Sequence, residues 1–151
     1  MMEERLFFEF LQVAIGNRVS LSAAIDDGDW LRLFEYCKKQ ALLGIGFTAV
    51  EKLHSLGVVC PATLRMQWYG YALQIERKNE KLNLQCRKLV ERFEHDGFSC
   101  CILKGQSNQM NYPDDLKLRR SLGDIDVWVT LMNDEGVKIN DGGTDIAVQI
   151  G

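Results

Sequence analysis

Gly123-Asp124-Ile125-Asp126-Val127-Trp128-Val129 is an apolar, β-branched run that carries two carboxylates. Its composition and its alternation of polar and apolar residues predict a β-strand. Successive side chains on a strand point to opposite faces, so Asp124 and Asp126 share one face. The apolar side chains at the alternate positions share the other face, which can enter a hydrophobic core. The stretch therefore predicts a strand that is buried on one side and acidic on the other.

The two aspartates on one face indicate a site for a divalent cation. Like charges held side by side repel each other, and a bound cation removes that repulsion. Mg²⁺ is commonly bound by one or two carboxylates together with phosphate oxygens of a substrate. Asp124 and Asp126 are therefore predicted metal ligands of a phosphoryl-transfer or nucleotidyl-transfer site. The alternative is a solvated strand face that carries two aspartates, because the D-x-D pattern is short and common.

Residues 98–103 read as another strand, and Lys104-Gly105 follows it directly. A glycine after a strand lets backbone N–H groups approach a phosphate closely. Lys104 or Arg120 can neutralise the charge of a triphosphate. The alternatives are a surface lysine at a strand end, a plain turn glycine, and a solvated loop pair at Arg119 and Arg120.

The residues before Gly97 read as helical. Apolar residues recur at three- and four-residue steps, and Pro61 is placed to open the longest helix. Gly44 and Gly46 are expected to interrupt the helical pattern, and Gly97 is expected to end it. The aromatic cluster at 68–71 is interpreted as core packing, with a base-stacking patch as the alternative. The expected helices cover residues 3–15, 21–25, 29–42, 47–55 and 61–93.

The residues after Gly97 read as a small sheet with connecting loops. A short helix is expected at 107–112, a turn at 112–115, a loop at 116–123, a hairpin loop at 133–143 and a last strand at 144–150. The predicted fold class is α+β, with a helical N-terminal region over residues 1–96 and a small mixed sheet over residues 97–151.

Composition narrows the classes of function. The chain has 151 residues, 46% of them hydrophobic, with a net charge of -3 and a pI near 5.4. This charge argues against a general nucleic-acid binder. No apolar run approaches the roughly 18 residues of a membrane-spanning helix. The N-terminus shows no secretory signal pattern, so a cytoplasmic location is the default expectation.

The five cysteines are an odd number, and their spacing fits no zinc-binding pattern. We expect reduced and mostly buried thiols. A catalytic cysteine is not expected, because neither His54 nor His95 stands in a recognisable partner motif.

Three motifs, taken in order, resemble the uncharacterised nucleotidyltransferase family of bacteria. They are Leu103-Lys104-Gly105, then Tyr112-Pro113, then the run from Arg120 to Val129. Members of that family read L-K-G, Y-P and R-x-x-G-D-I-D-h-W-V, where h is apolar. Arg77-x-Asn79 in the preceding helical region is similar too. The resemblance covers most of residues 28–130, and the ordered set is far more specific than any one piece.

The resemblance implies a fold of the DNA-polymerase-β type, in which a short mixed sheet is flanked by helices. It implies transfer of a nucleoside monophosphate from an NTP to an acceptor hydroxyl, with Mg²⁺ as the cofactor. The family's metal carboxylates fall on Asp124 and Asp126. The implied nucleotide-binding residues are Lys104, Gly105, Ser107, Arg120 and Gly123. The wider superfamily has a small hydroxyl residue directly after its glycine pair, whereas Gln106 stands there in this chain and Ser107 comes one residue later.

The superfamily also uses a third carboxylate on a later strand, often as the base near the acceptor hydroxyl. Asp145 is the candidate for this catalytic role, since it is the carboxylate in the expected last strand. Full members continue for many more residues, so the resemblance predicts an incomplete core sheet. This departure keeps two alternatives open: a catalytically silent or truncated module that acts in protein interaction, and an antitoxin-like partner protein. The sequence names neither the NTP nor the acceptor.

Overall fold

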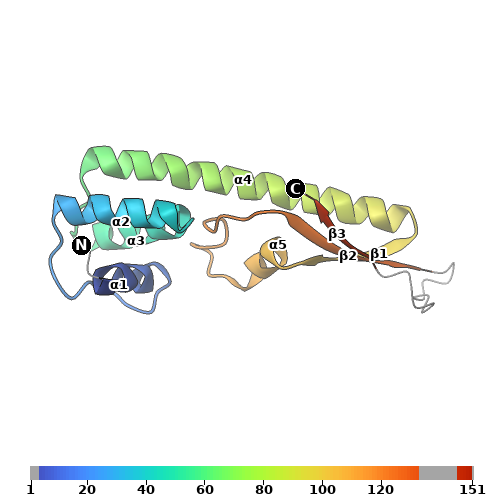
Figure 1. The fold of residues 1–151 in the computed structure, drawn as a ribbon, viewed down its shortest axis with the longest axis horizontal. Helices are drawn as coiled ribbons and strands as arrows, with labels where there is room; N and C mark the ends of the chain where they lie inside the picture. The colour runs from blue at the N-terminus through green and yellow to red at the C-terminus, as the bar shows by residue number, and fades with distance from the viewer. Residues whose placement is uncertain (1–3, 133–145, 151) are drawn as a thin grey trace. The chain divides into compact units, whose positions relative to one another are not determined.

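The computed structural model describes the backbone of residues 4–132 and 146–150 and the side chains of residues 4–132. The fold is α+β, as predicted (Figure 1). The elements in chain order are α1 (Glu4–Ala14), α2 (Asp27–Lys39), α3 (Leu43–Ser55), α4 (Ala62–His95), β1 (Phe98–Leu103), α5 (Gly105–Asn108), the 3₁₀ turn η1 (Gln109–Asn111), β2 (Ile125–Leu131) and β3 (Ile146–Ile150). Strand β1 has the predicted bounds, and the expected short helix starts two residues early, at Gly105. The expected hairpin loop at 133–143 lies outside the described residues.

The chain forms two compact units. The first contains Met1–Arg77 and Pro113–Ser121, and the second contains Lys78–Tyr112 and Leu122–Gly151. The boundary between Arg77 and Lys78 falls inside α4. The predicted division into domains at residue 96 remains a prediction.

An aromatic cluster forms the core of the first unit. Phe10, Trp30, Phe34 and Trp68 are all at most 2% exposed. The Trp68 ring lies 5.3 Å from the Phe34 ring and 5.8 Å from the Phe10 ring, measured between centroids. The Trp68 indole N–H donates a hydrogen bond of 2.8 Å to the carbonyl of Leu43. The interpretation of the aromatic cluster as core packing is therefore confirmed for Trp68, whereas Tyr69 is 44% exposed.

The expectation that Gly44 and Gly46 break a helix is wrong, because both lie inside α3. A Cβ at Gly44 would lie 2.0 Å from the backbone oxygen of Arg119. A Cβ at Gly46 would lie 2.7 Å from Cys37 Sγ and 2.8 Å from Trp68 Cζ2. These glycines therefore serve close packing within the helix, and the chain turns before them, at Ala41, which has a φ of 57°.

The expected short helix at 21–25 is not formed. The backbone N–H and the hydroxyl of Ser22 donate hydrogen bonds of 2.8 Å and 2.6 Å to the carboxylate of Glu9. These bonds hold the segment in an irregular conformation against α1. Helix α2 begins at Asp27, because Asp26 and Asp29 form a capping box in which each side chain accepts from the other residue's N–H.

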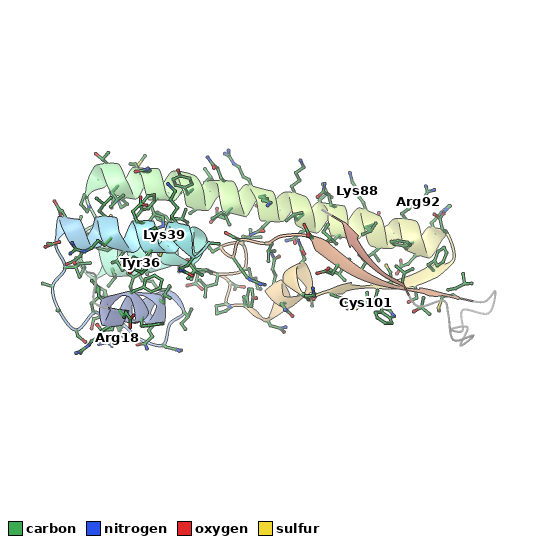
Figure 2. All side chains as sticks on the ribbon, viewed as in Figure 1. Arg18, Tyr36, Lys39, Lys88, Arg92 and Cys101 are labelled. Atoms are coloured by element: carbon green, nitrogen blue, oxygen red, sulfur yellow. The ribbon has the colours of Figure 1, made fainter. Side chains whose placement is uncertain are left out.

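The sheet of the second unit has the strand order β1-β2-β3, and both strand pairs are antiparallel. The expected mixed sheet would also contain a parallel pair, and none is found among the described strands. Ile125, Val127 and Val129 are at most 5% exposed and pack with Leu82, Cys86, Leu89 and Phe93 of α4. The strands run beside this part of α4, and Lys88 and Arg92 extend from its opposite side (Figures 1 and 2). The predicted buried face of the strand is confirmed.

Candidate functional site

The register of β1 and β2 brings the lysine-glycine turn to the acidic strand. Leu103, the last residue of β1, pairs with Asp126 of β2. Lys104 follows directly, and its Nζ lies 3.0 Å from Asp126 Oδ2. The Lys104 side chain is 74% exposed and the Asp126 side chain is 22% exposed. An ion pair at a water-accessible strand end can exchange partners with a solute, because solvent can replace either group.

The turn itself has an unusual backbone. Lys104 has a φ of 48° and a ψ of -149°, and Gly105 has a φ of 27°. A non-glycine residue with positive φ is uncommon and is held at a cost by its surroundings. Here the N–H and the hydroxyl of Ser107 donate hydrogen bonds of 2.9 Å and 2.7 Å to the carbonyl of Lys104. The predicted site residue Ser107 therefore stabilises the turn, and its contact with a nucleotide remains a prediction.

No atom lies close to the Cβ positions of Gly105 and Gly123, the two glycines of the predicted site. A Cβ at Gly105 would meet nothing closer than Leu122 Cδ2, at 3.9 Å. A Cβ at Gly123 would meet nothing within 4 Å. An extended anionic group can therefore approach the backbone at both positions, as the phosphate-binding prediction requires.

The predicted metal ligands lie two residues apart, at the start of β2. Asp124 directly precedes the strand and is exposed, while Asp126 lies within it. Among the residues whose side chains are described, no group of three or more His, Cys, Asp or Glu residues is placed to hold a metal ion. The predicted third carboxylate, Asp145, lies outside the described residues. Two aspartates nonetheless fit Mg²⁺, which takes its remaining oxygen ligands from phosphates and water.

The two arginines of the preceding loop belong to the first unit. The Arg119 side chain is 15% exposed and forms ion pairs with Glu76 and Glu51. Its Cζ lies 5.4 Å from the centre of the Phe47 ring. The alternative that made Arg119 a solvated loop residue is therefore wrong. Arg120 is exposed. Its predicted role at the triphosphate remains a prediction.

Buried amides beside the turn were not among the predicted site residues. Gln106 and Gln109 are 7% and 6% exposed. Asn83 of α4 donates a hydrogen bond of 2.8 Å from Nδ2 to Gln109 Oε1. In the sequence, Asn79, one turn before Asn83, interrupts the apolar stripe of α4, and in the structure it is 1% exposed. No comparable signal in the sequence pointed to Gln106 or Gln109.

The cysteines are free thiols, as expected. Cys37, Cys60 and Cys86 are buried, whereas Cys101 is exposed on the sheet (Figure 2). Burial raises the pKa of Cys37 to about 12 and the pKa of Cys60 to about 11. Such thiols stay protonated at neutral pH and are poor nucleophiles.

A family model described as "Uncharacterised nucleotidyltransferase" matches residues 26–136. The chain belongs to this family. The match contains the lysine-glycine turn, the loop with Arg120 and the Asp124–Asp126 pair, and it ends before Asp145. Searches of curated proteins and of solved structures found no match. Within the described residues, no helix has the length and apolar character needed to span a membrane.

Proposed function

We propose that this nucleotidyltransferase-family protein transfers a nucleoside monophosphate from an NTP to an acceptor hydroxyl, with Mg²⁺ as cofactor. The observation that carries the proposal is the 3.0 Å ion pair between Lys104 and Asp126. A cation suited to phosphate and a carboxylate suited to metal lie side by side at one end of the sheet. Phosphoryl-group transfer needs this combination, because positioning and charge neutralisation supply most of its catalysis.

The residues of the turn bind the phosphates in this proposal. Lys104 donates to the triphosphate, and the open backbone at Gly105 and Gly123 lets phosphate oxygens approach. The role of Arg120 at the triphosphate, which the family resemblance implies, stays a prediction. Asp124 and Asp126 are the carboxylates that would hold Mg²⁺, which when bound offsets the negative charge that develops on the phosphates.

The bond changes are those of an in-line displacement. The acceptor oxygen forms a bond to the α-phosphorus, the bond from that phosphorus to the bridging oxygen breaks, and pyrophosphate leaves. The hydroxyl proton passes to a base, and Asp145 is the predicted residue for that role. The products are the nucleotidylated acceptor and pyrophosphate.

The test is transfer by the purified protein. Each of the four NTPs, labelled at the α-phosphate, is incubated with protein, Mg²⁺ and a cell extract fractionated into protein, RNA and small molecules. We expect label in one fraction, and we expect Asp126→Asn to reduce it at least 100-fold, since a metal ligand is lost. Asp96→Asn is the matched control, because it removes an exposed carboxylate and its ion pair with Arg92 from the same unit.

A protein that transfers no label in any fraction contradicts the proposed reaction. If that protein still binds NTP in a Mg²⁺-dependent manner, the catalytically silent alternative is favoured. Equal transfer by the wild type and by Asp126→Asn contradicts the role of Asp126.

A further inference from the structure

The Gln106 side chain is buried without hydrogen bonds. It is 7% exposed, and neither its Nε2 nor its Oε1 has a hydrogen-bond partner among the described residues. Nε2 of Gln109, three residues later, is also buried without a partner there. Nearly all buried polar groups of folded proteins are hydrogen-bonded, because an unpaired one has lost its bonds to water without replacement. Within the part of the chain that the structure describes, nothing offsets the cost of burying these atoms.

The unpaired amides coincide with the strained turn. Gln106 directly follows Lys104-Gly105, where both residues have positive φ. Unpaired buried groups and strained backbone concentrate at functional sites, where a ligand or a second conformation compensates for them. The contiguity of both features in residues 104–109 indicates that this segment is built for a bound state rather than for the free state.

The two atoms of the Gln106 amide define the chemistry of the missing partner. Nε2 needs an acceptor, and Oε1 needs a donor. Phosphate oxygens of an ionised triphosphate only accept, so they leave Oε1 unpaired. A ribose hydroxyl and the edge of a nucleobase each offer what the amide lacks, since they donate as well as accept.

We propose that Gln106 binds the nucleoside part of the NTP, through hydroxyl or amide groups that both donate and accept hydrogen bonds. The inference rests on the proposed function and adds a specificity-determining residue to the same site. Gln106 turns out of its buried position when the phosphates occupy the Lys104-Gly105 turn, and its amide then pairs with the nucleoside.

The test is Gln106→Met, which keeps the length of the side chain and removes its polar atoms. In the free protein, the variant no longer buries an unpaired amide, so we expect its Tm to rise by about 2–4 °C. In calorimetric titrations with Mg²⁺ and each of ATP, GTP, CTP and UTP, we expect at least one NTP to bind about tenfold more weakly, or about 1.4 kcal/mol. Stability and affinity thus change in opposite directions.

Gln85→Met is the matched control, because Gln85 is an exposed glutamine of α4 in the same unit. We expect it to change neither Tm nor affinity. Titrations with 2′-deoxy-ATP and 3′-deoxy-ATP show whether the hydrogen bonds of Gln106 go to the ribose or to the base. If Gln106 binds a ribose hydroxyl, all four NTPs weaken equally and one deoxy analogue binds both proteins alike. If it binds the base, the loss of affinity differs among the four NTPs.

Two results would overturn the inference. One is a Gln106→Met variant that has a lower Tm or fails to fold, which shows that the amide is paired in the free protein by an internal water. The other is that the wild type binds NTP and the Gln106→Met variant binds every NTP with the same affinity as the wild type. A wild type that binds no NTP is distinct from both, since it overturns the proposed function as well.

Discussion

Glu9 is a buried carboxylate of the first unit, with a side chain that is 8% exposed. The hydroxyl and backbone N–H of Ser22 donate to it, and Arg5 and Arg18 lie 3.0 Å and 3.4 Å away. These interactions favour the charged form and lower the pKa of Glu9 from 4.5 to about 2, with the Ser22 hydroxyl as the largest cause. Glu9 therefore stabilises the fold above pH 4.5, and this contribution is lost as the pH falls from 4.5 to about 2.

Glu9→Gln should accordingly lower the free energy of unfolding at pH 7, and the difference from the wild type should shrink as the pH falls below 4.5. Urea denaturation at several pH values measures this. A difference that is the same at pH 7 and at pH 3 contradicts the assignment. Glu35→Gln serves as the control, because Glu35 is an exposed glutamate of α2.

The thiols give a second prediction for single residues. Cys101 is exposed, whereas Cys37 and Cys60 are fully buried and have a raised pKa. A thiol reagent at pH 8 should modify Cys101 at least 100-fold faster than Cys37 or Cys60, as followed by mass spectrometry of peptides. Comparable rates at Cys37 and Cys101 in the native protein would show that the first unit opens readily.

Strands β1 and β2 show where sequence patterns predict an element correctly, and helix α3 shows where they fail. The strand at 98–103 and the buried face of β2 were predictable, because alternation along a strand is a local property. Gly44 and Gly46 were misjudged, because their partners Arg119 and Trp68 are distant in sequence. Local propensity disfavours glycine in a helix, and close packing overrides that preference here.

A pair of alanine substitutions tests this account of α3. Gly46→Ala should destabilise the protein by about 1–3 kcal/mol, because the new methyl group would overlap Cys37 Sγ and Trp68 Cζ2. Gly70→Ala, in α4, should stabilise it by up to about 1 kcal/mol, because nothing lies within 4 Å of its Cβ position. Chemical denaturation measures both variants. Equal effects of the two substitutions contradict the packing role of Gly46.

At the scale of the whole molecule, the chain leaves the second unit at Pro113 and returns to it at Leu122. The intervening segment belongs to the first unit, where Arg119 pairs with Glu51 and Glu76 and Asp115 pairs with Lys52 at 2.8 Å. No local pattern in the sequence shows these long-range pairs. Lys104 and Asp126 of the candidate site were easier to predict than these ion pairs, because they belong to motifs whose order along the chain could be recognised. The burial of Gln106 could not be predicted, since it depends on how α5 packs.

In the proposed function, Asp124 and Asp126 act together with the Lys104-Gly105 turn in binding an NTP through Mg²⁺. Loss of the exposed ion pair at Lys104 costs at most about 1 kcal/mol, and circular dichroism of the variant without both aspartates checks that it folds. The decisive measurement is calorimetric titration of ATP into the wild type and into Asp124→Ala/Asp126→Ala, each with Mg²⁺ and with EDTA. We expect Mg²⁺ to strengthen binding to the wild type at least tenfold and to leave binding to the double variant unchanged. Equal Mg²⁺-dependent binding by both proteins would contradict this expectation.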